Sequence, residues 1–284
     1  MNVYILIFIL IVLLYYSNII EVSHYEVKSK KLPSSFHNFK ILQLSDLHGK
    51  NFGHNNKYLI KKIRNENPDI IVMTGDMINN RDKNYMNFFK LSSEISKTYD
   101  TYYIFGNHEE DLNDDIKKSL KNRVENLNIK TLYNNKISIV RNNENINLYG
   151  LCFNMKYYKK PHKISEDFNI IENQKLLGKL DENSYNILLA HNPLYFDVYS
   201  KWGADLILSG HIHGGIIRLP FIGGLLSPER KFFPKYYAGR YTLNHSELIV
   251  NRGLGNTKVK LRIFNKPEIS VITLKKAAKS MCNH

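Results

Sequence analysis

Short apolar runs that alternate with amphipathic stretches constrain this chain more than any other feature. Runs of buried-strand character occupy residues 40–44, 70–74, 102–105, 186–190 and 205–209. Stretches with apolar residues three and four positions apart lie between them, at residues 56–65, 85–96 and 112–125. Because strands and helices that alternate along a chain pack as a sheet covered by helices, this pattern predicts an α/β fold.

The last quarter of the chain has a different texture. After His213, glycine and proline punctuate short apolar runs at residues 216–219, 247–251, 261–264 and 269–274. This pattern predicts a second, mostly antiparallel sheet. We therefore expect one catalytic domain over residues 40–275, preceded by a linker or first strand at 23–39 and followed by a solvated basic tail at 276–284.

The N-terminus carries an unbroken apolar run, VYILIFILIVLLYY, at residues 3–16, which resumes at Ile19 and Ile20. At about 1.5 Å per residue, this segment approaches the roughly 30 Å of a bilayer core at the short end of the range. No basic region precedes the run and no small-residue cleavage site follows it, so an uncleaved anchor is favoured over a removed signal peptide. It predicts a single-pass anchor in the cell membrane at residues 1–22, with a buried core helix as the alternative. The charges that follow leave the side of the membrane open.

The chain is basic, with 40 lysine and arginine residues against 26 aspartate and glutamate residues and a formal net charge of +14. Such an excess favours an anionic partner, but the cations are scattered, so a bias in composition explains it equally well. A nuclease needs a contiguous basic face, which makes nucleic acid an unfavoured partner. Two cysteines, Cys152 and Cys282, are too few for a disulfide framework.

Polar side chains of the metal-binding kind follow five of the predicted strands. The seven candidate ligands are Asp46 and His48, Asp76, Asn107, His191, and His211 and His213, and His108 follows Asn107 directly. Ligands of open α/β sheets gather beyond the carboxyl ends of the strands, so these side chains are expected at one rim. In an extended segment, residues two apart face the same side, as in the pairs Asp46/His48 and His211/His213. Glycines at 75, 106 and 210 would let the chain turn close to the site.

The ligand types indicate which metals suit this rim. Imidazoles with carboxylate and amide oxygens, and no thiolate, favour Mn, Fe or Zn. Seven candidate ligands exceed one tetrahedral shell, and Asp76 lies centrally among them, so two divalent ions bridged by Asp76 are expected. A positive cluster of this kind would bind a phosphate anion and deprotonate a water.

The ordered set of motifs resembles the calcineurin-like metallophosphoesterase superfamily. The motifs are Asp46-x-His48, Gly75-Asp76, Gly106-Asn107-His108-Glu109, His191 and Gly210-His211-x-His213. SGHIHGGIIRLP at 209–220, NRGLG at 251–255 and NKPEIS at 265–270 are similar to its bacterial membrane-associated branch. The resemblance implies a four-layer α/β/β/α sandwich. It also implies a first metal on Asp46, His48 and His213, a second on Asn107, His191 and His211, and Asp76 bridging them. His108 would be the catalytic acid, or alternatively a group that only orients its neighbours.

The implied activity is hydrolysis of a phosphoester by a hydroxide held between the two metals. An apolar segment at 219–226 could touch lipid beside the site, which would favour a lipid-linked pyrophosphate or diester, or could be a core hairpin. Arg218, Arg230 and Lys231 are candidate phosphate contacts. The alternatives are a nuclease or cyclic-nucleotide phosphodiesterase, a protein phosphatase, and a metal-binding scaffold without catalysis. The presence of His108 disfavours the scaffold, and no obligate protein partner is implied.

Overall fold

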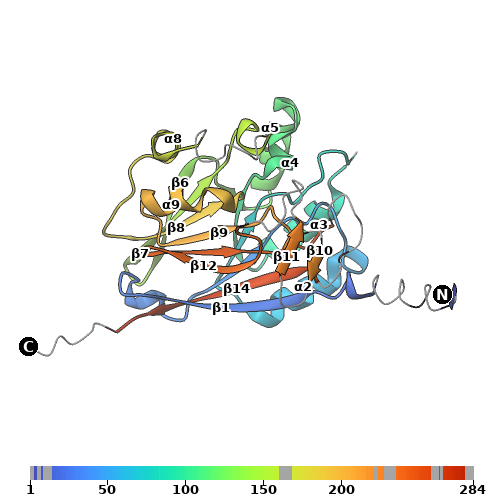
Figure 1. Ribbon diagram of the computed structural model, residues 1–284, viewed down its shortest axis with the longest axis horizontal. Coiled ribbons are helices and arrows are strands. Elements are labelled where there is room, and N and C mark those ends of the chain that lie inside the picture. The colour runs from blue at the N-terminus through green and yellow to red at the C-terminus, as the bar shows by residue number, and fades with distance from the viewer. Residues whose placement is uncertain are drawn as a thin grey trace, which may run out of the picture.

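Two six-stranded sheets form the centre of the molecule (Figure 1). The computed structural model describes residues 3, 4, 8, 15–82, 84–159, 168–215, 217–219, 223–226, 235–256, 262 and 265–278. The first sheet has the order β1 (Glu21–Ser29), β14 (Glu268–Lys276), β2 (Lys40–Leu44), β3 (Ile70–Thr74), β4 (Asp100–Ile104) and β5 (Ile129–Thr131). The second has the order β12 (Gly239–Leu243), β13 (Ser246–Val250), β9 (Leu206–Ser209), β8 (Tyr185–Ala190), β7 (Glu144–Leu151) and β6 (Asn135–Arg141).

Helices cover the outer faces of both sheets. On the side of the first sheet lie α2 (Lys57–Glu66), α3 (Met86–Ser96) and α5 (Asp114–Glu125), with the short α4 (Asn107–Glu110) at the end of β4. On the side of the second lie α8 (Ile170–Leu177) and α9 (Phe196–Trp202). The short α6 (Lys156–Lys159) packs through Tyr157 in the same apolar cluster as Trp202 of α9. Single 3-10 turns occupy Ser34–Phe36, His54–Asn56 and Pro193–Tyr195, and a two-stranded ribbon joins β10 (Ile217–Leu219) to β11 (Gly223–Leu226).

The alternation of side chains along the second sheet explains the layers. In β9, Leu206 and Leu208 belong to the apolar cluster shared with the first sheet, whereas Ile207 belongs to the cluster that contains Trp202 of α9. Successive residues of a strand face opposite sides, so both faces of this sheet are buried. Helix, sheet, sheet and helix therefore stack in that order. Truncating a core residue such as Leu208 to alanine would cost about 2–5 kcal/mol.

The composition of the second sheet corrects the sequence-based expectation. Its central strands β7, β8, β9 and β13 are parallel, and it is antiparallel only where β6 pairs with β7 and β12 with β13. The predicted run at 269–274 belongs to β14, which joins the first sheet between β1 and β2. The prediction of a mostly antiparallel sheet was therefore wrong. Of the predicted strand at 261–264, only Arg262 is among the described residues, and it is not in a strand.

The predicted membrane anchor at residues 1–22 was also wrong. In the part of the chain that the structure describes, no helix is both long enough and apolar enough to cross a membrane. Ile20, which was counted toward the anchor, is buried in the apolar core, and β1 begins at Glu21 and pairs with β14. The single-pass location in the cell membrane fails with the anchor.

Candidate metal centre

The carboxyl ends of β2, β3, β8 and β9 and the start of α4 bring the predicted ligands to one place. Three groups have ligand atoms that all lie within 4.8 Å of one another: Asp46 with His48 and His213, His48 with Asp76 and His108, and Asp76 with His191 and His211. Asn107, beside them on α4, has a buried side-chain oxygen with no hydrogen-bond partner in the described structure. The groups share His48 and Asp76, so they form one continuous cluster.

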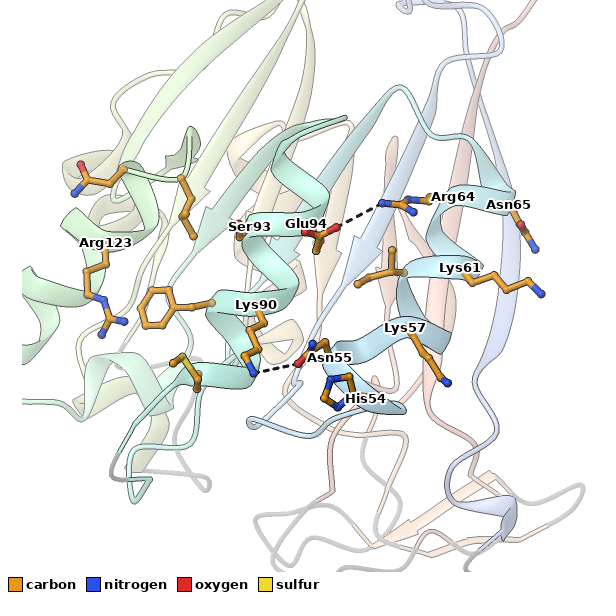
Figure 2. A pocket seen from close by; sticks show the side chains of 15 residues that line it. His54, Asn55, Lys57, Lys61, Arg64, Asn65, Lys90, Ser93, Glu94 and Arg123 are labelled. Atoms are coloured by element: carbon orange, nitrogen blue, oxygen red, sulfur yellow. Dashed lines mark hydrogen bonds and ion pairs between the residues drawn. The ribbon is translucent and has the colours of Figure 1, made fainter.

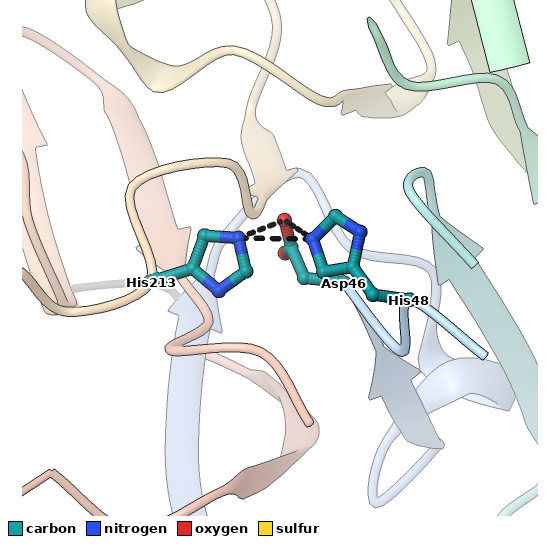
Figure 3. Close-up of side chains that lie close together, drawn as sticks. All are labelled: Asp46, His48 and His213. Atoms are coloured by element: carbon teal, nitrogen blue, oxygen red, sulfur yellow. Dashed lines mark hydrogen bonds and ion pairs between the residues drawn. The ribbon is translucent and has the colours of Figure 1, made fainter. Parts of the chain in front are cut away.

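Asp46, His48 and His213 form one half of this cluster, which we call the first half (Figure 3). His213 Nε2 lies 3.3 Å from Asp46 Oδ1 and 3.1 Å from His48 Nε2. His48 Nε2 lies 4.0 Å from the same carboxylate oxygen. Two imidazole nitrogens that lie this close together beside a carboxylate are suited to coordinate one cation. A divalent metal ion fits this set of donors.

Asp76, His191 and His211 form the second half. His191 Nδ1 donates a hydrogen bond to the Thr74 carbonyl oxygen over 2.6 Å, which leaves the Nε2 lone pair facing the carboxylates. That Nε2 lies 3.4 Å from Asp76 Oδ2 and has no hydrogen-bond partner among the described residues, although it is buried. Asp76 Oδ2 also lies 3.8 Å from His48 Nε2, so this carboxylate sits between the halves. The unpaired buried atoms fit a second cation.

The charges of the two halves differ. Burial would lower the pKa of His191, but the carboxylates of Asp76 and Asp46 outweigh it and raise that pKa to about 10. Burial prevails at His48 and lowers its pKa to about 4, despite Asp76 nearby. For Asp76 itself, burial would raise the pKa, but His191 and the other histidines hold it well below its ordinary value. The carboxylates of Asp76 and Asp46 therefore favour a positive charge beside His191 in the second half.

Five of the seven predicted ligands have left-handed backbone. The φ angles are 49° at Asp46, 46° at His48, 52° at Asp76, 72° at His211 and 56° at His213. The pairs two residues apart therefore do not lie in extended segments, and it is the left-handed turns that direct their side chains to the cluster. His211 and His213 even face different halves. Such conformations cost about 1–3 kcal/mol each and persist where the surrounding structure enforces them.

Two of the predicted glycines make the close approach possible. A Cβ on Gly210 would lie 1.9 Å from Ser45 Oγ and 2.3 Å from Asp46 Oδ2. A Cβ on Gly106 would lie 2.3 Å from Asp76 Oδ1. Neither contact is physically possible without displacing a carboxylate of the cluster, which explains why the chain has glycine where the strands end.

His108 lies at the edge of the cluster with its ring held by the backbone. Its Nδ1 accepts a hydrogen bond from the Asn80 backbone N–H over 3.3 Å, which places the proton of a neutral ring on Nε2. That Nε2 lies 3.9 Å from Asp76 Oδ2, and the side chain is 27% exposed. A histidine that is partly open to solvent and presents N–H toward the cluster is placed to give a proton.

Three supporting residues were missed by the sequence analysis. Glu109 accepts hydrogen bonds from the backbone N–H groups of Asp76, Ile78 and Gly106, at 2.8, 3.1 and 2.8 Å. The Asn265 side chain donates to the carbonyl oxygens of His213 and Gly215, and the buried Arg262 guanidinium lies 3.4 Å from His213 Nδ1. Glu109 and Asn265 stand within quoted motifs, which was a usable signal. No pattern pointed to Arg262.

Several predicted contacts fall outside what the structure describes. Arg230 and Lys231 are not among the described residues, and only the backbone of Arg218 is, within β10. Of the segment 219–226, the residues 220–222 are likewise not described. No described residue supports a contact between this segment and lipid.

A separate groove of about 970 Å³ lies between α2, α3 and α5 (Figure 2). Its lining includes apolar residues such as Ile60 and Phe89 as well as the cations Lys57, Lys61, Arg64, Lys90 and Arg123. Arg64 of α2 pairs with Glu94 of α3 at 3.6 Å, and Lys90 Nζ of α3 donates to Asn55 Oδ1 of the 3-10 turn before α2 over 3.0 Å. None of the predicted ligands lines this groove, which is therefore distinct from the metal centre.

Residues 39–215 match the family model described as calcineurin-like phosphoesterase, which covers every predicted ligand of the cluster. This chain is a calcineurin-like phosphoesterase. The predicted superfamily and the predicted hydrolase class are thereby confirmed. The family and the histidine and aspartate groups together indicate a divalent metal site.

Relatives of this calcineurin-like phosphoesterase extend over most of its length. An uncharacterized metallophosphoesterase of Bacillus subtilis, YkuE, is 30% identical over 91% of this chain and 86% of its own. The phosphodiesterase YaeI of Escherichia coli is 27% identical over 83% of this chain and 82% of its own. Among solved structures, TT1561 of Thermus thermophilus matches 76% of this chain and 89% of its own at 12% identity, with a TM-score of 0.47.

Proposed function

We propose that this phosphoesterase hydrolyses phosphodiesters at a centre of two divalent cations. Asp46, His48 and His213 would hold the first ion. Asn107, His191 and His211 would hold the second, and Asp76 would bridge the two. The observation that carries this proposal is the convergence of six of these seven side chains, all but Asn107, into groups that are joined through His48 and Asp76. The donor set of imidazole, carboxylate and amide suits Mn, Fe or Zn.

When bound, two such ions neutralise charge on the phosphoryl oxygens and lower the pKa of water, so that a nucleophile forms near neutral pH. The protein holds the ligands in place beforehand. Thr74 fixes the ring of His191 through its carbonyl, and Glu109 fixes the backbone of Asp76. Ligands that need not reorganise during the reaction give the largest stabilisation of the transition state.

His108 would donate its Nε2 proton to the oxygen of the departing alcohol. The hydrogen bond from Asn80 to Nδ1 supports this role because it keeps the proton on the nitrogen that faces the cluster. An alkyl alcohol is a poor leaving group without a proton, so the acid matters most for such esters. A diester substrate is favoured over a monoester because the Escherichia coli relative is named a phosphodiesterase.

The test is metal content together with turnover of two matched esters. Protein purified without chelator should carry about two transition-metal ions per chain by elemental analysis, and with added Mn should cleave bis(4-nitrophenyl) phosphate faster than 4-nitrophenyl phosphate. One ion or fewer per chain after loading with excess metal would contradict the dinuclear centre. Faster cleavage of the monoester would make a phosphomonoesterase the better description.

Replacing His108 separates proton donation from metal binding. His108→Ala should keep both ions, while kcat falls about 100- to 10,000-fold for an alkyl ester and less for a nitrophenyl ester, whose leaving group needs no proton. His54→Ala is the matched control, because His54 lies in the groove of Figure 2 away from the cluster. Loss of an ion from His108→Ala would show that His108 is a ligand, since it belongs to one of the three groups.

A further inference from the structure

Tyr158 lies against the second half of the metal centre and belongs to none of the motifs. It is in α6, and its ring centroid lies 5.3 Å from that of His211 and 6.2 Å from that of His191. The ring planes are tilted by 61° and 56° to those of the two histidines. The phenol therefore packs on the two imidazoles that would hold the second ion.

The hydroxyl of Tyr158 is buried and has no hydrogen-bond partner within the described residues. Leaving a buried hydroxyl unpaired costs about 1–3 kcal/mol. Its neighbours show that this region can satisfy such groups: Tyr195 donates to the Tyr157 carbonyl over 2.9 Å, and Tyr199 donates to the Asn192 carbonyl over 2.8 Å. Other unpaired tyrosine hydroxyls, such as those of Tyr149 and Tyr185, occur on strands, whereas that of Tyr158 belongs to a ring that packs on two histidines of the cluster.

The phenol remains a donor at neutral pH. A tyrosine hydroxyl ordinarily has a pKa of about 10, so it keeps its proton at neutral pH. A protonated phenol has one O–H to give and carries no charge. The partner that suits it is an acceptor that arrives with the substrate and carries negative charge, because hydrogen bonds to charged acceptors are about twice as strong as neutral ones.

We propose that Tyr158 is a substrate-contacting residue whose hydroxyl donates a hydrogen bond to a non-bridging phosphoryl oxygen on the His191 and His211 side of the centre. This role rests on the proposed phosphodiesterase function and deepens it. As charge grows on the phosphoryl oxygens during hydrolysis, the same hydrogen bond strengthens, so Tyr158 would serve the transition state as well as binding.

The experiment compares Tyr158→Phe with Tyr157→Phe in the metal-loaded protein. Both changes delete one hydroxyl and keep the ring, and both lie in α6, but the Tyr157 hydroxyl is 3.5 Å from Glu172 Oε2 and its ring packs on Phe153 and Phe168. The measurements are ion content by elemental analysis, the dissociation constant of inorganic phosphate by titration calorimetry, and turnover of bis(4-nitrophenyl) phosphate.

Tyr158→Phe should keep the wild-type ion content and bind phosphate about tenfold more weakly, as expected for loss of one hydrogen bond to a charged group. Its kcat/KM should fall at least as much, while Tyr157→Phe stays within about twofold of wild type on every measure. Unchanged phosphate affinity in a fully loaded Tyr158→Phe protein would overturn the inference. Loss of an ion would also overturn it, since Tyr158 would then support the metal. If the wild type binds neither ions nor phosphate, the proposed function itself fails.

Discussion

The ligands in the two halves of the metal centre are held in place by different kinds of group. The first half depends on side chains from the C-terminal part of the chain, where Asn265 holds the His213 carbonyl over 2.6 Å and Arg262 lies behind the ring. The second half depends on β3 and α4, because the Thr74 carbonyl holds His191 and the buried Glu109 of α4 holds the backbone of Asp76. The group that holds the His191 ring is a backbone carbonyl, which no substitution removes, whereas the groups that hold His213 are side chains. His213 should therefore be easier to release than His191.

Removing the carboxylate of Asp76, which lies between the halves, should disable both of them. It has the largest expected effect on ion content and turnover. Asp76→Ala should lose both ions and lower kcat/KM about a thousandfold or more, since the metals contribute several kcal/mol to the transition state. Elemental analysis and diester turnover measure this. Asp100→Ala is the control, because Asp100 is exposed at the start of β4. If Asp76→Ala retained one tightly bound ion, Asp76 would serve a single half.

Glu109 tests how far the second half depends on the side chain that α4 supplies. Glu109→Ala leaves the backbone N–H groups of Asp76, Ile78 and Gly106 without their acceptor, at about 1–3 kcal/mol for each unsatisfied group. We expect the free energy of unfolding to fall by about 3 kcal/mol or more, measured in urea. Exposed Glu125, replaced by alanine, should change it by less than about 0.5 kcal/mol. A stable Glu109→Ala protein would refute this brace.

Asn265 tests the first half alone. Asn265→Ala removes both hydrogen bonds to the turn that carries His213. Groups behind metal ligands typically contribute about 10- to 100-fold to affinity, so one of the two ions should bind that much more weakly while the other is unaffected. Competition with a calibrated chelator resolves the two affinities. Exposed Asn183, replaced by alanine, supplies the baseline. Equal weakening of both ions would mean that the halves are not independently braced.

The smallest effect is expected outside both halves. Lys61 lines the groove between α2 and α3 (Figure 2), which contains none of the cluster residues. Lys61→Ala should leave ion content unchanged and diester kcat/KM within about twofold of wild type, as is usual for exposed positions. A larger loss would connect the groove to the substrate and weaken the view that the centre consists of the two halves alone.

Local patterns predicted the part of the site that local structure determines. The bounds of β2 and β3 match the predicted runs, and the ligands at 46, 48, 76, 191 and 211 do follow strand ends. Those predictions succeeded because a buried strand and the polar turn after it are adjacent in sequence. The metal-binding roles of these residues stay predictions.

The predictions that failed concern contacts between segments that are distant in sequence. The parallel pairing of β9 with β13 and the place of β14 beside β1 are tertiary choices that no local period encodes. The brace from Arg262 to His213 spans 49 positions and carries no motif. The prediction of an anchor failed because an apolar composition does not by itself specify a membrane span, and Ile20, which was counted toward the anchor, is buried in the apolar core.

The left-handed turns at the cluster limit how this enzyme could be retuned. Asn, Asp and His adopt such backbone more readily than other non-glycine residues, and β-branched side chains hardly adopt it at all. The types that coordinate hard and borderline ions are thus also the types that these turns accept. A library randomised at Asp46, His48 and His213 should return folded clones rich in Asn, Asp, His and Gly. Engineering a softer centre built on other donors would require new turns as well as new side chains.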